Sequence, residues 1–147
     1  MLNAQWFHGQ EMVSHDGVPY PAIWVDNRLA ALFSQGDIIR GAWGGPLHVV
    51  SGYRTAEHNT RVGGAQHSQH MEGRAFDIAP FCQPDRMAEQ CLDLHARILR
   101  LIHEGKLPLV GGLGVYPAWV HVDVRPKPPS GHLAQWVGTG VGSEQAA

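Results

Sequence analysis

The chain has 147 residues, 44% of them hydrophobic, and a formal net charge of -2 at pH 7. This length suits one domain with a continuous core that needs neither disulfides nor repeats. Its lysines and arginines are scattered, so the basic patch of a nucleic-acid or anionic-membrane binder is missing. No run approaches the roughly 18 apolar residues of a membrane-spanning helix, and we expect no membrane insertion.

The N-terminal sequence MLNAQWFHGQEM lacks the basic start, apolar stretch and cleavage site of a secretory signal. We therefore expect synthesis in the cytoplasm without a signal peptide. The two cysteines, Cys82 and Cys91, do not have the paired spacing of a structural metal or redox motif. Cys91 instead belongs to an apolar stripe with helical spacing, which predicts a buried, inert thiol. The stripe consists of Met87, Cys91, Leu94, Ile98 and Leu101.

The first predicted element is a helix. Asp26 can cap it after a turn-rich start, and it should run to about residue 41 with Gly36 as a weak point. Its inner face carries Leu29, Leu32 and Phe33. The remaining elements follow from β-branched runs, alternation and helix-start signals. They are strands at 47–53, 74–80, 109–115 and 119–125, a short helix at 55–62 and a long helix at 84–105.

These elements do not alternate strictly between strand and helix. We therefore predict an α+β fold with a small antiparallel sheet and helices packed on one face. One domain should span residues 1–137, and a Gly-rich flexible tail should span 138–147. The first 40 residues carry no usable motif, and we expect them to cover one side of the core and to shape the cleft.

Two of the predicted strands place polar side chains on a single face. Side chains alternate along a strand, so Asp77 in 74–80 points away from the core between two alanines. In 119–125 the valines face the core, and His121 and Asp123 share the opposite face. One face of each strand can therefore pack while the other carries chemistry.

His70 completes a candidate metal site. It precedes Asp77 by seven residues, and the turn-forming Gly73 between them would let it reach the same face. Together with His121, these residues offer three ligands and an open fourth position, as in catalytic zinc sites. The chain has ten histidines, so chance pairings are expected. Spacing alone leaves a surface or hydrogen-bonded role open for each histidine.

The segments SGYRTAEHNTRVGGAQHSQHMEGRAFDI and GGLGVYPAWVHVDVRP resemble the zinc-dependent D-Ala-D-Ala carboxypeptidase and murein endopeptidase superfamily. That superfamily shares its fold with the Hedgehog signalling domain. The resemblance covers about residues 47–126 and is greatest to short members from bacteriophages and prophages. It includes S-x-H-x-x-G-x-A-x-D followed by H-x-D, represented here by Ser68, His70, Gly73, Ala75, Asp77, His121 and Asp123.

The resemblance implies one zinc ion per chain, bound by His70, Asp77 and His121. It also implies a substrate-anchoring and catalytic role for Arg54, whose planar guanidinium can hold a peptide carboxylate in bidentate fashion. The implied activity is hydrolysis of peptidoglycan stem peptides or cross-links by a D,D-carboxypeptidase or endopeptidase. The substrate is thus a cell-wall peptide and the reaction uses a metal-activated water.

The sequence departs from the family at the general base. Several branches use a glutamate three residues before the last ligand or a histidine two before it, where this chain has Ala118 and Trp119. Asp123 is the remaining candidate, and its alternative role is to orient a liganding imidazole. Trp119 and Ser68 are expected at the substrate, with Ser68 also bonding its loop. His67 is expected as a solvated loop residue, with substrate contact as the alternative.

The leading hypothesis is a phage-type endolysin that acts at the bacterial wall after lysis-type release or as part of the virion. The alternative is a non-catalytic zinc module that recognises peptide or builds a phage tail, because the usual base is missing. A third option is iron or manganese at the same two-histidine, one-aspartate site. The sequence does not predict the oligomeric state.

Overall fold

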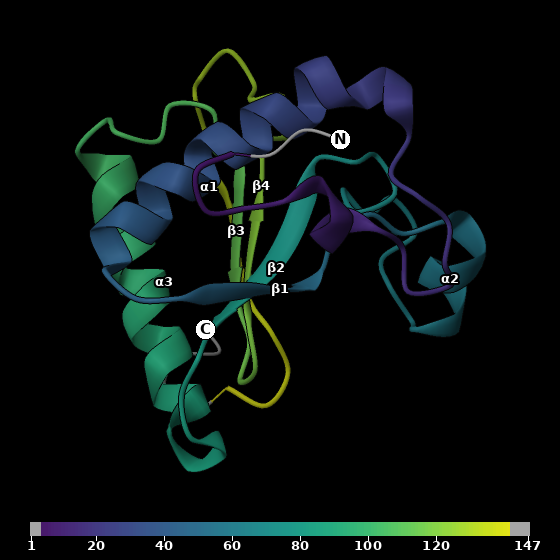
Figure 1. Cartoon of the computed structure of the whole chain (residues 1–147). Helices are drawn as coiled ribbons and strands as arrows, with labels where there is room; N and C mark the ends of the chain where they lie inside the picture. The colour runs from purple at the N-terminus through teal and green to yellow at the C-terminus, as the bar shows by residue number, and fades with distance from the viewer. Residues whose placement is uncertain (1–3, 142–147) are drawn as a thin grey trace.

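The structure, a computed structural model, describes residues 4–141 and has the predicted α+β class (Figure 1). The α-helices are α1 (Ala30–Trp43), α2 (Ala56–Arg61) and α3 (Met87–His103). The strands are β1 (Leu47–Ser51), β2 (Ala75–Pro80), β3 (Gly112–Val115), β4 (Val120–Asp123) and β5 (Ala134–Val137). Each predicted element is present and shorter than the sequence pattern indicated, although α1 extends past its predicted end near residue 41, and β5 is additional.

The five strands form one mixed sheet in the order β1-β2-β4-β3-β5. Neighbouring strands are antiparallel except β3 and β5, which are parallel. The predicted antiparallel pairing is therefore confirmed for β1 to β4, and the parallel β5 makes the sheet mixed at one edge. β5 is a four-residue strand after a Pro-rich stretch, and its pairing with β3 is a long-range contact. No local pattern signals such a contact, since the hydrophobic period identifies a strand but not its partner.

The core lies between one face of the sheet and the helices α1 and α3 (Figure 1). α3 packs against β2, β3 and β4, and it buries Cys91, Leu94, Ile98 and Leu101 as the apolar stripe predicted. α2 stands apart from these two helices, on the other side of the sheet (Figure 1). The prediction that helices cover one face thus holds for α1 and α3 only.

The start of the first helix differs from the prediction. A 3₁₀ turn over Ala22–Trp24 and a π turn over Val25–Leu29 lead into α1, and Asp26 makes no side-chain cap. The Trp24 N–H already donates to Pro21 O at 3.1 Å, so the chain is wound before it reaches Asp26. No free helix start remains there for the carboxylate to cap, because caps act on unpaired N–H groups.

Gly36 is a close-packing position rather than a weak point of α1. The rings of Phe7 and Phe76 lie against it, Phe33 packs on both rings, and all three side chains are buried. A Cβ at Gly36 would lie 2.9 Å from Phe7 Cε2 and 3.0 Å from Phe76 Cζ. The absence of a side chain at Gly36 lets α1 approach the aromatic cluster closely. Each phenylalanine buried there contributes about 1.5–3 kcal/mol to stability.

The N-terminal segment covers part of the core, as expected, and it also fixes the loop before β2. Tyr20 donates a hydrogen bond to Gly73 O at 2.6 Å, and Arg28 donates one to Glu72 O at 2.7 Å. Its residues do not line the main cavity found among residues 4–141, in contrast to the expectation that they shape the cleft. Their effect on that cavity is indirect, through the loop that carries His70.

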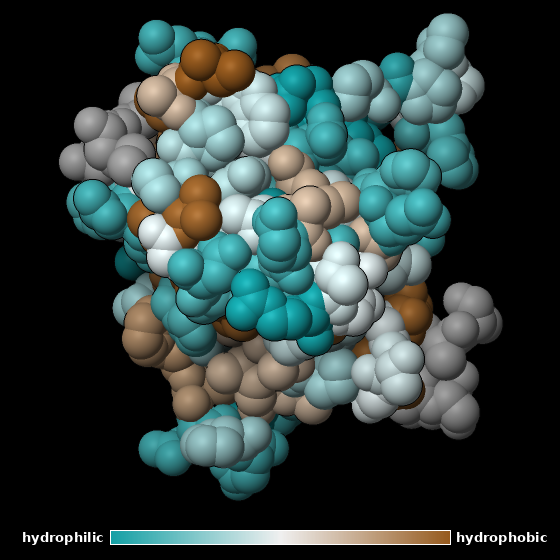
Figure 2. Space-filling view, turned by 90° about the vertical axis from the view of Figure 1, so that its right-hand side faces the viewer, coloured by the Kyte–Doolittle hydropathy of each residue, from teal (hydrophilic) through white to brown (hydrophobic). Residues whose placement is uncertain are grey.

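Among the residues that the structure describes, no helix has the length and apolar character to cross a membrane. The face on the α2 side is largely hydrophilic, and its hydrophobic residues lie in small separate areas (Figure 2). Of the predicted tail, residues 142–147 lie outside the described residues.

Candidate active site

Three side chains from two adjacent strands and one loop converge on the sheet face opposite the core. Asp77 on β2 pairs in register with His121 on β4, so both project from neighbouring positions of the same face. The loop before β2 brings in His70. One Asp77 oxygen, Oδ1, lies 3.2 Å from His70 Nε2 and 3.1 Å from His121 Nδ1. All three residues are buried, and their ligand atoms lie within 4.8 Å of one another.

The second nitrogen of each imidazole has a hydrogen-bond acceptor of its own. His70 Nδ1 donates to the carbonyl oxygen of Gly52 at 2.7 Å. His121 Nε2 donates to Asp123 Oδ2 at 2.8 Å. A neutral imidazole has one N–H, so His70 Nε2 and His121 Nδ1 are left as acceptors facing Asp77. This fixed choice of tautomer is the usual arrangement of metal-liganding histidines.

Three hydrogen-bond acceptors, His70 Nε2, His121 Nδ1 and Asp77 Oδ1, therefore face one another with no hydrogen atom between them when both imidazoles are neutral. A positive charge at their centre, either a metal ion or protons on the imidazoles, is needed to offset the repulsion. Two imidazoles and a carboxylate are ligands that divalent transition metals accept. The residues present thus fit a metal ion, and His70, Asp77 and His121 would hold it.

In the cluster of His70, Asp77 and His121, the pKa values of the two histidines shift in opposite directions. Burial lowers the pKa of His70, although the Asp77 carboxylate opposes this shift. Burial also acts to lower the pKa of His121, but hydrogen bonds with Asp123 and Asp77 outweigh it and raise that pKa. Asp77 is desolvated too, yet its two histidine neighbours hold its pKa well below the usual range. The carboxylate is therefore ionised at neutral pH and suited to bind a cation.

Asp123 lies behind His121 and not beside the converging atoms. Its side chain is fully buried, and Arg125 donates to Oδ1 at 2.9 Å through Nε and to Oδ2 at 2.6 Å through Nη2. Burial opposes ionisation, but His121 and Arg125 lower its pKa to about 2. Gly112 on β3 leaves room for it, since a Cβ there would meet Asp123 Oδ2. This arrangement is that of the orienting role, one of the two roles that the sequence left open.

Arg54 holds the other oxygen of Asp77. Its Nη2 lies 3.4 Å from Asp77 Oδ2, and its Nε and Nη1 donate to Ser51 Oγ and Asn59 Oδ1. Burial lowers the pKa of Arg54, while Asp77 and Tyr116 oppose this shift. The guanidinium remains a cation at any working pH. It is thus fixed beside the cluster with its positive charge directed at the cavity.

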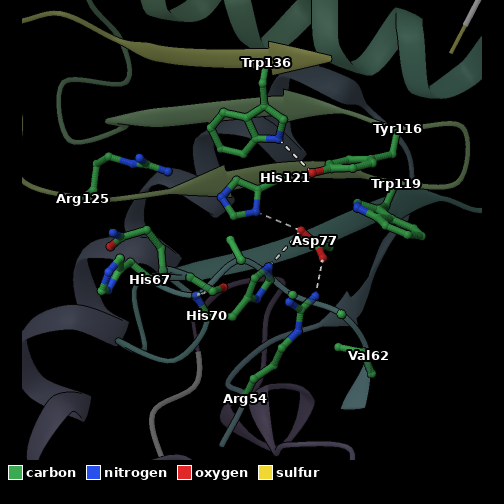
Figure 3. A pocket seen from close by; sticks show the side chains of 15 residues that line it. Arg54, Val62, His67, His70, Asp77, Tyr116, Trp119, His121, Arg125 and Trp136 are labelled. Carbon is green, nitrogen blue, oxygen red and sulfur yellow. Dashed lines mark hydrogen bonds and ion pairs between the residues drawn. The ribbon is translucent and has the colours of Figure 1, made fainter. Parts of the chain in front are cut away.

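The cluster forms the floor of a cavity of about 570 Å³ (Figure 3). Its wall carries two arginines and three Tyr or Trp side chains, and Asp77 is the only carboxylate among the described lining residues. The lining comprises Arg54, Val62, Gly63, Gly64, Ala65, His67, Ser68, Gln69, His70, Asp77, Tyr116, Trp119, His121, Arg125 and Trp136. A cavity of this size admits a short peptide segment.

Comparison with protein families matches residues 14–123 to peptidase M15. The match covers more than half of the chain and contains all three converging residues, His70, Asp77 and His121. The chain belongs to the peptidase M15 family. No curated protein matches it. Membership agrees with the resemblance drawn from the motif and indicates a metallopeptidase scaffold, because the cluster that could bind a metal lies within the matched region.

The other predicted M15 site residues lie around the cavity in different ways. Ser68 is buried and its Oγ accepts a hydrogen bond from His70 N at 3.2 Å, so it shapes the loop that presents His70. Trp119 stands on the wall, where its ring stacks on Tyr116 with centroids 5.0 Å apart. His67 is exposed and lines the same cavity, so contact with a substrate is open to it. Substrate contacts for all of these remain predictions.

Sequence reasoning missed Tyr116 and Trp136. Alternation along β3 gave a signal for Tyr116, because Gly112, Gly114 and Tyr116 share the face on which Gly114 pairs with His121. Trp136 had no such signal. It lies on β5, beyond the region matched to peptidase M15, and only the parallel pairing with β3 brings it to the cavity.

Proposed function

We propose that this protein is a zinc-dependent peptidase that hydrolyses peptide bonds in bacterial peptidoglycan, in stem peptides or in cross-links. One observation carries the proposal: His70, Asp77 and His121 present three acceptor atoms to one point on the floor of a cavity. Membership of the peptidase M15 family and the resemblance of the motif to D-Ala-D-Ala carboxypeptidases and murein endopeptidases support it.

In this proposal zinc, when bound, acts as a Lewis acid that polarises the scissile carbonyl and makes water a better nucleophile near neutral pH. The protein's own residues prepare the site. Gly52 O and Asp123 hold the two imidazoles in the liganding tautomer. Arg54 supplies a fixed cation that can bind a substrate carboxylate, such as the C-terminus of a stem peptide.

We propose that the enzyme acts at the bacterial wall, after release at lysis or as part of a virion. The resemblance of its motif to short phage and prophage enzymes supports this setting. The partner is a peptide of the wall, and the carboxypeptidase and endopeptidase alternatives differ in whether Arg54 binds a free C-terminal carboxylate. Products separated by mass distinguish the two, because a carboxypeptidase releases single D-alanine.

A non-catalytic zinc module is the second candidate, and the cavity itself gives an observation in its favour. Ala118 and Trp119 occupy the positions where related enzymes carry a base, and Asp123 is engaged behind His121. Outside the cluster, His67 is the only imidazole among the described residues that line the cavity. Such a module would bind zinc and peptide without cleaving the peptide.

The experiment is turnover of purified muropeptides by protein of known zinc content. The zinc-loaded wild type should cut, a chelator should abolish cutting, and added zinc should restore it. His70→Asn should lose both zinc and turnover, whereas His103→Asn, at the exposed end of α3, should keep both. If one zinc binds per chain and no wall fragment is cut, the non-catalytic candidate replaces the peptidase.

A further inference from the structure

A hydrogen bond between two aromatic side chains crosses the cavity wall beside the metal-binding cluster. Trp136 Nε1 lies 2.8 Å from the hydroxyl oxygen of Tyr116. Trp136 comes from β5 and Tyr116 follows β3, and both line the cavity (Figure 3). The indole nitrogen can only donate, so the phenol oxygen must be the acceptor of this bond.

The remaining hydrogen of the Tyr116 hydroxyl is therefore directed away from Trp136. Within residues 4–141, Trp136 is the only hydrogen-bond partner of this hydroxyl. Figure 3 shows the ring of Tyr116 above Asp77, with its hydroxyl end turned toward His121. The tyrosine can thus donate one hydrogen bond to a molecule in the cavity.

Ring contacts on both sides hold the hydroxyl in place. Tyr116 stacks on Trp119, and the Trp136 ring packs on the ring of His121 with centroids 4.9 Å apart. The strands make room for these rings at two glycines. A Cβ at Gly114 would lie 2.4 Å from Trp136 Nε1, and a Cβ at Gly138 would overlap the Tyr116 ring. A donor that is fixed before substrate arrives needs no reorganisation during the reaction.

We propose that Tyr116 is a catalytic residue whose hydroxyl donates a hydrogen bond to the scissile carbonyl oxygen as negative charge develops there. Trp136 is the positioning residue, since its N–H donates to the phenol oxygen, holds it at the cavity wall and leaves the O–H free to donate to a bound molecule. This inference rests on the proposed peptidase function. It gives Trp136, which lies beyond the matched peptidase M15 region, a part in the reaction.

The test compares Tyr116→Phe with Tyr53→Phe, which removes a hydroxyl from a ring that does not line the described cavity. Loss of one such donor lowers kcat by about 10²–10³, so Tyr116→Phe should lose kcat on that scale with KM and zinc content little changed. Trp136→Phe keeps a ring and removes the N–H. It should lower kcat by less than Tyr116→Phe does. Tyr53→Phe should retain wild-type kcat.

A second readout does not depend on turnover. A phosphinate dipeptide carries the tetrahedral, anionic geometry of the reaction, and calorimetry gives its affinity for the zinc-loaded protein. Tyr116→Phe should bind it at least tenfold more weakly than wild type does, with unchanged affinity for the cleaved stem peptide, which has no tetrahedral centre. Equal phosphinate affinity, or unchanged kcat in folded Tyr116→Phe, overturns the role of Tyr116 and leaves the peptidase function standing. Failure of the wild type to cut any muropeptide overturns the function itself, and the phosphinate comparison still decides whether Tyr116 donates.

Discussion

Asp123 Oδ2 accepts a hydrogen bond from His121 Nε2 at 2.8 Å, on the side of the imidazole opposite to the nitrogen that faces Asp77. Arg125 bonds both oxygens of the same carboxylate. The carboxylate therefore affects the cavity through two side chains that line it, the ring of His121 and the guanidinium of Arg125. Two consequences of this relationship can be measured separately.

The first concerns metal affinity. Asp123→Asn should weaken zinc binding by about 10–100-fold, because partners that orient a liganding histidine contribute on that scale. Turnover of muropeptides at saturating zinc should stay within about 100-fold of wild type, because an orienting partner affects activity by no more than that scale. Competition with a chelator of known affinity measures the first quantity. Asp93→Asn, an exposed change on α3, is the control. A loss of about a thousandfold or more at saturating zinc would instead identify Asp123 as the general base.

The second concerns the pKa of His121. In the zinc-free protein this pKa is raised, since hydrogen bonds to Asp123 and Asp77 outweigh burial, which acts to lower it. The stabilisation that results from this raised pKa is thus fully present below the unfolded-state pKa of about 6.5. It is lost as the pH rises through the pKa of His121 in the folded protein. Asp123→Asn removes a negative charge that favours imidazolium, so the pKa should fall. Histidine-ring NMR titrations of both proteins measure it, and an unchanged or higher value in the variant contradicts the assignment.

A third prediction concerns the packing of α1 rather than the site. Gly36→Ala should destabilise the protein by about 1–3 kcal/mol, because its Cβ would lie 2.9 Å from the buried ring of Phe7. Gly41→Ala is the matched control on the same helix, where the nearest atoms belong to Trp6 at 3.6 Å. It should stabilise by about 0.5–1 kcal/mol, the usual gain from replacing a helical glycine. Denaturant unfolding measures both, and a neutral Gly36→Ala would mean that the rings of the cluster move apart easily.

The sequence by itself determined the candidate ligands and the class of fold. Strand alternation has a period of two, so Asp77 and His121 were assigned to the polar faces of two strands without knowledge of their pairing. His70, seven residues before Asp77 with the turn-forming Gly73 between them, completed the candidate set, and the motif agreed with it. The same periodicity predicted the buried stripe of α3, because a helix face depends only on residues three and four apart.

Only the tertiary structure decided the rest. Whether Asp123 faces the cavity or supports His121 depends on the ring orientation and on the two bonds from Arg125. Trp136 reaches the cavity through parallel pairing of β5 with β3. Local periodicity carries no information on which distant strands pair, and a strand of four residues gives a weak pattern even for its own existence. The walls of the cavity and the position of the Tyr116 hydroxyl therefore follow from long-range packing, whereas the candidate metal ligands could be named from strand alternation and short spacing.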